Sequence, residues 1–191
     1  MQTSRKLNIK KKHIYMKTKH ILFFTFLFLF SCKFQFTDDE LHLPRRDYYG
    51  TELKVNGCYY ILYENTMTWV YFLFNNGTIL YWGCEYSIDD TIEFNKDLMD
   101  KNYISYLQED KVSWGIYIIE NDSIKFERWY PREPPSPAYV RSGIILNDTT
   151  FLITEGYRLV RGEKTEYRIK DETYHFKKIS PKPDSTNRFV P

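Results

Sequence analysis

Few residues of this 191-residue chain have the types and spacing that catalysis or metal binding needs. Beyond the first 31 residues the histidines are His42 and His175, which do not have the spacing of a ligand pair, and no Cys-x-x-Cys occurs. His175 lies between two aromatic residues, where a histidine more often satisfies its nitrogens locally than acts as a general base. Asp89 and Asp90 are adjacent, so their carboxylates would point apart on a strand and suit a turn or helix cap better. We therefore expect no catalytic residue, no metal site, no cofactor and no enzyme.

The N-terminal segment has the composition of an export signal. It carries seven Lys and Arg and no acidic residue before Cys32, and residues 21–30 are apolar except for Thr25. A basic region, a short apolar core and a small residue before a cleavage point are typical of secretory signal peptides. The apolar run is too short to cross a bilayer, which takes about 20 residues. We therefore predict a signal peptide at residues 1–31, and Met16, which opens a complete basic region of its own, is an alternative start.

The end of this segment, Leu29-Phe30-Ser31-Cys32, resembles the lipobox of bacterial lipoproteins. In that family the signal peptide is removed before the cysteine, which becomes the acylated first residue. The resemblance implies a lipidated Cys32 in the bacterial cell envelope, expected at the outer membrane, with the periplasmic and the outer face both open. Each buried methylene of an acyl chain contributes about 0.8 kcal/mol, so several chains would hold the domain without a transmembrane helix. Residues 32–53 would then be the lipidated cysteine and a tether; ordinary cleavage, which leaves Cys32 as a thiol, is the alternative.

If Cys32 takes lipid, Cys58 and Cys84 remain as a candidate disulfide in an oxidising compartment. The expected strand register opposes this bond. A two-residue turn at Asn76-Gly77 would place both cysteines on one face but two strands apart, more than about 10 Å and beyond disulfide reach. A bulge or a slipped register would change that distance, so both states stay open.

Removal of the signal peptide reverses the charge of the chain. The formal charge is +2, but the seven cations of the leader are lost with residues 1–31, which leaves −5. The most basic stretch that remains, residues 158–168, is interrupted by Glu163 and Glu166, which is typical of solvated strand faces. Nucleic-acid binding needs a basic patch and is therefore not expected.

Aromatic residues dominate the composition and favour strands. The chain has 17 Tyr, 14 Phe and 4 Trp but a single alanine, Ala138. Apolar runs alternate with turn residues, and Asn76-Gly77 is the strongest hairpin signal. We predict an all-β fold in which an antiparallel meander of eight or nine strands closes into a barrel, with one short helix in the 89–110 connection. Residues 69–74 are apolar on both faces, so one face would line the barrel and the helix or the Pro-rich loop at 131–137 would cover the other.

The order of four segments resembles that of small lipocalin-like bacterial lipoproteins. The resemblance implies a lipocalin-like barrel over residues 54–180, followed by a flexible tail at 181–191. Members of this group largely lack a known activity, so it implies a fold more than a function. The segments are Gly57-Cys58-Tyr59-Tyr60, the aromatic hairpin at 72–78 with its glycine turn, Trp114-Gly115-Ile116-Tyr117 and Tyr174-His175-Phe176.

Two functions fit these expectations. The first is a membrane-anchored lipoprotein whose barrel binds a small apolar ligand, although the same side chains could simply fill the interior of an eight-stranded barrel. The second is a structural or interaction lipoprotein without a ligand cavity, which binds a protein or a glycan through exposed aromatic residues at Trp129, Tyr130 and Tyr139. The predicted lining of the first is Tyr60, Leu62, Trp69, Tyr71, Leu80 and Trp82.

Overall fold

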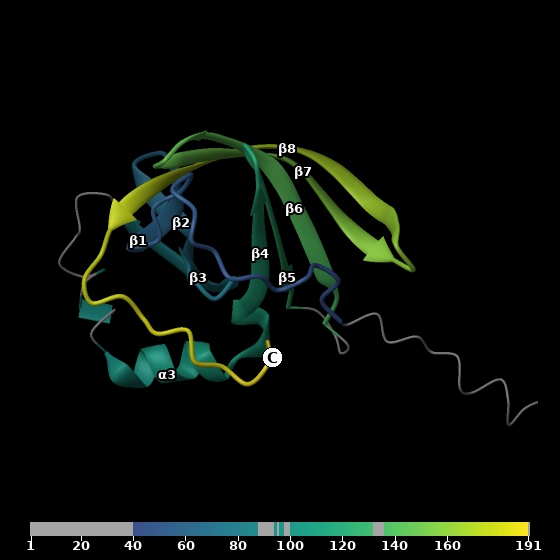
Figure 1. Ribbon diagram of the computed structural model, residues 1–191. Coiled ribbons are helices and arrows are strands. Elements are labelled where there is room, and N and C mark those ends of the chain that lie inside the picture. Colours follow the sequence, from purple (N-terminus) through teal and green to yellow (C-terminus); the bar gives the residue numbers. More distant parts are fainter. Residues whose placement is uncertain (1–39, 88–93, 95, 98–99, 132–135, 191) are drawn as a thin grey trace, which may run out of the picture. The chain divides into compact units, whose positions relative to one another are not determined.

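The computed structural model describes residues 40–87, 94, 96–97, 100–131 and 136–190. Its strands form a closed antiparallel barrel in which each strand pairs with its neighbours in sequence and the last pairs with the first (Figure 1). The predicted all-β meander, its closure into a barrel and the short helix are confirmed. The elements are β1 (Gly57–Tyr63), β2 (Thr66–Leu73), β3 (Thr78–Ser87), α3 (Lys101–Glu109), a 3-10 turn (Lys111–Ser113), β4 (Trp114–Glu120), β5 (Ser123–Trp129), β6 (Ala138–Asn147), β7 (Thr150–Val160) and β8 (Glu163–Lys178).

The hairpin between β2 and β3 differs from the sequence prediction by one residue. Phe74 N–H donates to the carbonyl of Thr78 (3.0 Å), so the loop has three residues rather than two. Gly77 closes it at φ 75°, and a Cβ there would lie 2.2 Å from the carbonyl oxygen of Arg46. Three-residue hairpin loops commonly end in such a left-handed glycine. Leu73 therefore pairs with Ile79 and not with Leu80, and a shift of one residue exchanges the two faces of a strand.

Aromatic rings fill the interior of the barrel. The ring centroids of Phe151 and Tyr174 lie 4.8 Å apart in a stacked arrangement, and Tyr59 lies 5.1 Å from Phe151. Tyr71 adds contacts of 5.0 Å to Phe126 and 5.6 Å to Tyr174. All five rings are at most 1% exposed. They therefore occupy the space that an apolar ligand of the barrel would need.

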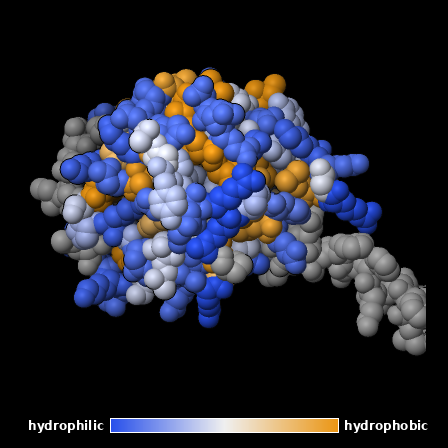
Figure 2. All heavy atoms as spheres, viewed as in Figure 1, coloured by the Kyte–Doolittle hydropathy of each residue, from blue (hydrophilic) through white to orange (hydrophobic). Residues whose placement is uncertain are grey.

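A second apolar cluster covers the outside of β2, β3 and β4. It contains Phe72, Trp82 and Trp114, with α3 packed against them through Leu107. The side chain of Asp100 caps the first turn of α3, and Trp82 Nε1 donates to the hydroxyl of Tyr103 on that helix (2.9 Å). The expected cover for the second apolar face of β2 thus includes the predicted helix. On the side of the molecule shown in Figure 2, hydrophobic areas also reach the surface between hydrophilic side chains.

Residues 181–190, assigned to a flexible tail from the sequence, pack against the barrel. Lys182 is the main attachment point, since its ammonium donates to the carbonyls of Val55 (2.6 Å) and Leu73. Asn76 donates to the hydroxyl of Ser185 (3.1 Å), and Val190 is 5% exposed within the outer cluster. This segment is therefore part of the folded domain, and in Figure 1 it runs from the end of β8 past α3.

The part of the expected tether that the structure describes also packs on the barrel. Its anchor is Glu127, a carboxylate on β5 that is fully buried. Glu127 accepts the backbone N–H groups of His42 (2.6 Å) and Leu43 (2.8 Å), and the Nδ1 atom of His42 lies 3.0 Å from its other oxygen. Tyr48 and Leu53 continue the attachment as buried residues. The domain therefore begins well before residue 54.

Candidate functional site

The six residues expected to line one ligand cavity lie on different surfaces. Tyr71 faces the barrel interior, whereas Leu80 and Trp82 are buried in the outer cluster and Tyr60 packs against that cluster. Leu62 is 43% exposed and Trp69 is 38% exposed. Because the hairpin register is shifted by one residue, and because the β1–β2 and β2–β3 pairings contain irregularities at 59–61 and 68–70, the assumed single face does not exist.

The interior rings end at a buried arginine, Arg128, at the end of β5. It is 4% exposed, and its guanidinium lies between the rings of Tyr81 (3.8 Å) and Tyr130 (3.9 Å). Its Nε donates to the hydroxyl of Tyr71 (3.3 Å), and its Nη1 donates to the carbonyls of Val112 and Trp129. Burial lowers the pKa of Arg128, but the surrounding tyrosines outweigh this effect and raise it above its ordinary value. Arg128 is thus a buried cation at the end of the interior, and most of its hydrogen-bond donors are used within the protein.

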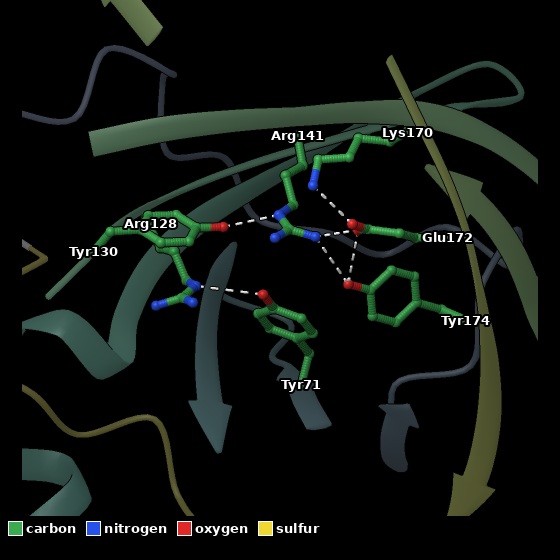
Figure 3. Close-up of polar contacts among 7 residues, drawn as sticks. All are labelled: Tyr71, Arg128, Tyr130, Arg141, Lys170, Glu172 and Tyr174. Carbon is green, nitrogen blue, oxygen red and sulfur yellow. Dashed lines mark hydrogen bonds and ion pairs between the residues drawn. The ribbon is translucent and has the colours of Figure 1, made fainter. Parts of the chain in front are cut away.

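Arg141 of β6 lies close to Arg128 and is also buried, at 7% exposure. Its Nε donates to the hydroxyl of Tyr130 (2.8 Å), and its Nη1 bonds Glu172 and the hydroxyl of Tyr174 (3.3 Å), as Figure 3 shows. Lys170 donates to the other oxygen of Glu172 at 3.0 Å. Burial lowers the pKa of Arg141, but the neighbouring tyrosines and Glu172 raise it well above its ordinary value. Arg141 therefore stays charged at any pH at which the domain is folded.

A cavity of about 260 Å³ opens next to Arg141. Its walls come from the end of β5, the start of β6, the late part of β7 and the early part of β8, which all lie at one end of an antiparallel meander. The cavity is therefore the mouth of the barrel, above the ring-filled interior. Its lining residues are Tyr130, Pro131, Tyr139, Arg141, Gly156, Glu166, Arg168 and Lys170.

The mouth carries a surplus of positive charge. Arg141, Arg168 and Lys170 face the cavity, against Glu166 in the lining and Glu172 just behind it. Glu166 is also occupied by an ion pair to Arg158 at 3.6 Å and by a hydrogen bond from Tyr139. Cations in a concave, partly desolvated site attract anions more strongly than they would on an open surface. The arrangement is therefore suited to binding an acidic group.

Trp69 of β2 contacts Arg141 from another strand of the barrel. Its ring centroid lies 4.8 Å from the guanidinium carbon of Arg141, within cation–π distance. Its backbone has φ 51°, an uncommon conformation for a bulky residue, at the irregularity between β2 and β3. Such a strained backbone conformation is often found at functional sites.

The remaining candidates lie away from this mouth. Cys58 is a free, fully buried thiol, and burial raises the pKa of Cys58 to about 12, which makes it unreactive. The side chain of Cys84, its candidate partner, lies outside the described residues. His42 is bound to Glu127, and the ring of His175 lies 6.1 Å from that of Tyr60. Residues 1–39, with the leader and Cys32, and Asp89-Asp90 lie outside the described residues. Within the described ranges, no three His, Cys, Asp or Glu side chains converge as a metal centre requires, and no helix has the length and hydropathy to cross a membrane.

The two buried arginines were not singled out from the sequence. Side chains two residues apart on a strand lie on the same face. Arg128 therefore shares the face of Phe126, and Arg141 shares the face of Tyr139. A charged residue two positions from an aromatic residue that faces into the barrel or its mouth is the signal that could have identified them. Arg168 belongs to the stretch that the sequence assigned to solvated strand faces, yet one face of that stretch lines the mouth.

No protein-family model, no curated protein and no solved structure matches this chain. The resemblances of Leu29–Cys32 and of residues 54–180 to bacterial lipoproteins therefore stay predictions.

Proposed function

We propose that this protein is a lipid-anchored envelope lipoprotein whose barrel binds a small acidic ligand at its mouth. The location rests on the basic, apolar and Ser31-Cys32 sequence of the leader. The ligand rests on one observation, the convergence of Arg141, Arg168 and Lys170 on a cavity of about 260 Å³. This proposal keeps the expected binding role of the barrel but changes the chemistry of the ligand from apolar to acidic.

The interior rings favour this change. An apolar ligand would have to displace rings that contact one another at about 5 Å and are almost inaccessible to solvent. Expelling packed aromatic side chains would forfeit their burial, which contributes about 1.5–3 kcal/mol for each large apolar side chain. The mouth needs no such rearrangement. Its volume lies slightly below the range of about 300–1,000 Å³ of most small-molecule sites, which suits a compact ligand.

The donor geometry of Arg141 suits a carboxylate or phosphate group. A guanidinium carries five N–H donors, and the hydrogen bonds to Tyr130, Glu172 and Tyr174 use Nε and Nη1. The Nη2 donors can therefore serve a ligand while the rest of the group stays fixed. Arg168, which is exposed at the rim, and Lys170 supply further positive charge from β8. A ligand could reach both without a rearrangement of the barrel.

A glycan is the second candidate, and one observation favours it. Tyr130 and Tyr139, two of the three aromatic residues named for glycan or protein binding, line the same mouth with their ring centroids 5.3 Å apart. The third, Trp129, is 4% exposed and belongs to the outer cluster. An acidic sugar would satisfy both the tyrosines and the cations, so the two candidates share one site.

The ligand proposal predicts binding of simple anions that depends on charge at the rim. We expect inorganic phosphate and citrate to bind at low salt, and Arg168→Gln to weaken binding about tenfold, since a charge-assisted hydrogen bond contributes about 1.5–3 kcal/mol. Isothermal titration calorimetry measures this. Lys178→Gln, which removes the same charge from an exposed site further along β8, is the matched control. No binding by the unmodified protein, or equal weakening in both variants, would contradict the proposal.

The anchor is tested separately at Cys32. We expect Cys32→Ser, expressed in a bacterial host, to leave the membrane fraction or to accumulate as uncleaved precursor, because serine cannot take the thioether-linked lipid. The Ser31→Ala variant keeps a small residue before the cleavage point and should behave as the unmodified protein does. Membrane fractionation with mass spectrometry of the N-terminal peptide measures both. Retention on membranes of a Cys32→Ser protein that has lost residues 1–31 would argue against a lipid anchor at this residue.

A further inference from the structure

Strand β8 is longer than the strand that closes the barrel against it. On one side it pairs with β7 from Glu163 to His175, but on the other side β1 pairs only from Tyr174 onward. Among the described residues, no strand pairs with this second edge between Glu163 and Thr173. Figure 1 shows the consequence, a β7–β8 hairpin that extends beyond the rest of the barrel. A row of backbone N–H and C=O groups is therefore available for another strand.

Four side chains of this edge, from Tyr167 to Lys170, are of two kinds. Asp171 and Glu172 follow them, and Glu172 is already bound by Arg141 and Lys170. Arg168 and Lys170 line the cationic mouth. Tyr167 and Ile169 alternate with them and are 55% and 82% exposed. An added strand would place every second side chain beside the cations and the others beside this exposed apolar pair. The edge thus favours a partner that alternates acidic with apolar residues.

We propose that an extended acidic segment of another protein adds to β8 as a further strand between Tyr167 and Thr173, with its carboxylates beside Arg168 and Lys170. This inference rests on the proposed anion site and names the carrier of the acidic group. Addition of a strand to an open edge gives affinity through backbone hydrogen bonds and specificity through alternate side chains. The cavity beside Arg141 then takes one carboxylate of the segment.

The same features disfavour pairing between two copies of this chain. In the antiparallel register that centres two β8 edges on Ile169, Arg168 and Lys170 of one copy would lie opposite Lys170 and Arg168 of the other, and like charges opposed across strands are destabilising. Glu166, at φ 50° beside an irregularity in the β7–β8 pairing, bends the strand on the hairpin side of Tyr167. The usable edge is therefore short and selects for opposite charge.

The test uses the folded protein and a short capped peptide that alternates glutamate with valine. A peptide strand pairs through alternate backbone N–H groups only. We therefore compare two N-methylated versions, one methylated at every glutamate and one at every valine. One version is expected to lose about tenfold or more in affinity while the other is much less affected. A lysine–valine peptide should bind at least about tenfold more weakly, and so should the glutamate–valine peptide to Arg168→Glu but not to the control Lys178→Glu.

Hydrogen exchange locates the bound peptide. The amides of residues 167–173 that point to the open edge should become protected from exchange in its presence, whereas phosphate should not protect them. If phosphate binds in an Arg168-dependent way but both N-methylated peptides bind as well as the parent, the strand addition is wrong and the anion site stands. If neither phosphate nor any peptide binds, the anion site is wrong and this inference is wrong with it.

Discussion

The barrel is expected to lose its stability steeply between about pH 10 and pH 12. Burial raises the pKa of Tyr71 from 10.0 and that of Cys58 from 9.0, each to about 12. Burial likewise raises the pKa values of Tyr59, Tyr117 and Tyr174 above the ordinary tyrosine value. The unfolded chain releases these protons near pH 9 to 10 and the folded chain does not, so stability falls as the pH rises above the unfolded values. Each buried group costs about 1.4 kcal/mol per pH unit, and together they rival the 5–15 kcal/mol that stabilise a typical domain.

Lys182 changes the stability of the domain in the opposite direction, over a lower pH range. Burial lowers the pKa of Lys182 from 10.5 to about 8. Between these values the unfolded chain binds more protons at this residue than the folded chain does, so stability rises with pH from about 8 to 10.5. Since the Cys58 effect begins near pH 9 and the tyrosine effects near pH 10, a shallow maximum is expected between about pH 8 and 10. The loss above it is the larger effect.

Urea denaturation at a series of pH values, with ultraviolet absorbance to follow tyrosinate, measures this profile. Tyr117, whose hydroxyl donates to the carbonyl of Phe74 at 2.9 Å, is the variant site of choice. Tyr117→Phe should reduce the slope of stability against pH by about 1.4 kcal/mol per unit above pH 10. Tyr63→Phe, at a residue that is 65% exposed, should leave the slope unchanged. Ordinary tyrosine titration in a protein that remains folded would contradict the prediction.

Local sequence signals predicted the meander and its closure but not the faces of its strands. Asn76-Gly77 marks a hairpin, yet a two-residue and a three-residue loop are both compatible with it, and the choice decides which side of β2 faces inward. Because the outer side of β2 is also buried, under α3 and the C-terminal segment, Phe72 and Tyr71 on opposite faces are both large aromatic residues, and the pattern cannot distinguish the faces. The interior set was therefore assigned to the wrong combination of residues.

The cationic mouth depends on long-range pairing that no local pattern contains. Arg141 meets Glu172 only because β6, β7 and β8 pair in a particular register, with irregularities that bring Gly156 opposite Arg141 and Arg168. In the sequence, Arg168 is one of several charges in an alternating stretch. The site is recognisable only when the burial of Arg141 is combined with the alternation of side chains along β6 and β8.

Removal of Arg141 is expected to destabilise the domain strongly. Arg141→Met should lower the free energy of unfolding by about 3–5 kcal/mol, because it leaves Glu172, 13% exposed, without its main partner. Lys170, at 3.0 Å from Glu172, remains and favours the lower end of that range. The hydroxyls of Tyr130 and Tyr174 also lose a donor. Urea denaturation at neutral pH measures the change.

The double variant Arg141→Met, Glu172→Leu separates stability from ligand binding. Replacing both members of a buried ion pair by apolar residues is often neutral or stabilising, so the double variant should regain most of the loss. It should nevertheless bind phosphate about tenfold more weakly than the unmodified protein, because the cation that faces the cavity is gone. Lys54→Met is the matched control: its ion pair with Asp148 (2.8 Å) is about half exposed, and its loss should cost less than about 1 kcal/mol. A double variant as unstable as Arg141→Met would show that the arginine acts through packing, whereas recovered stability with lost binding would mean that the pair is retained for the anion it helps to hold.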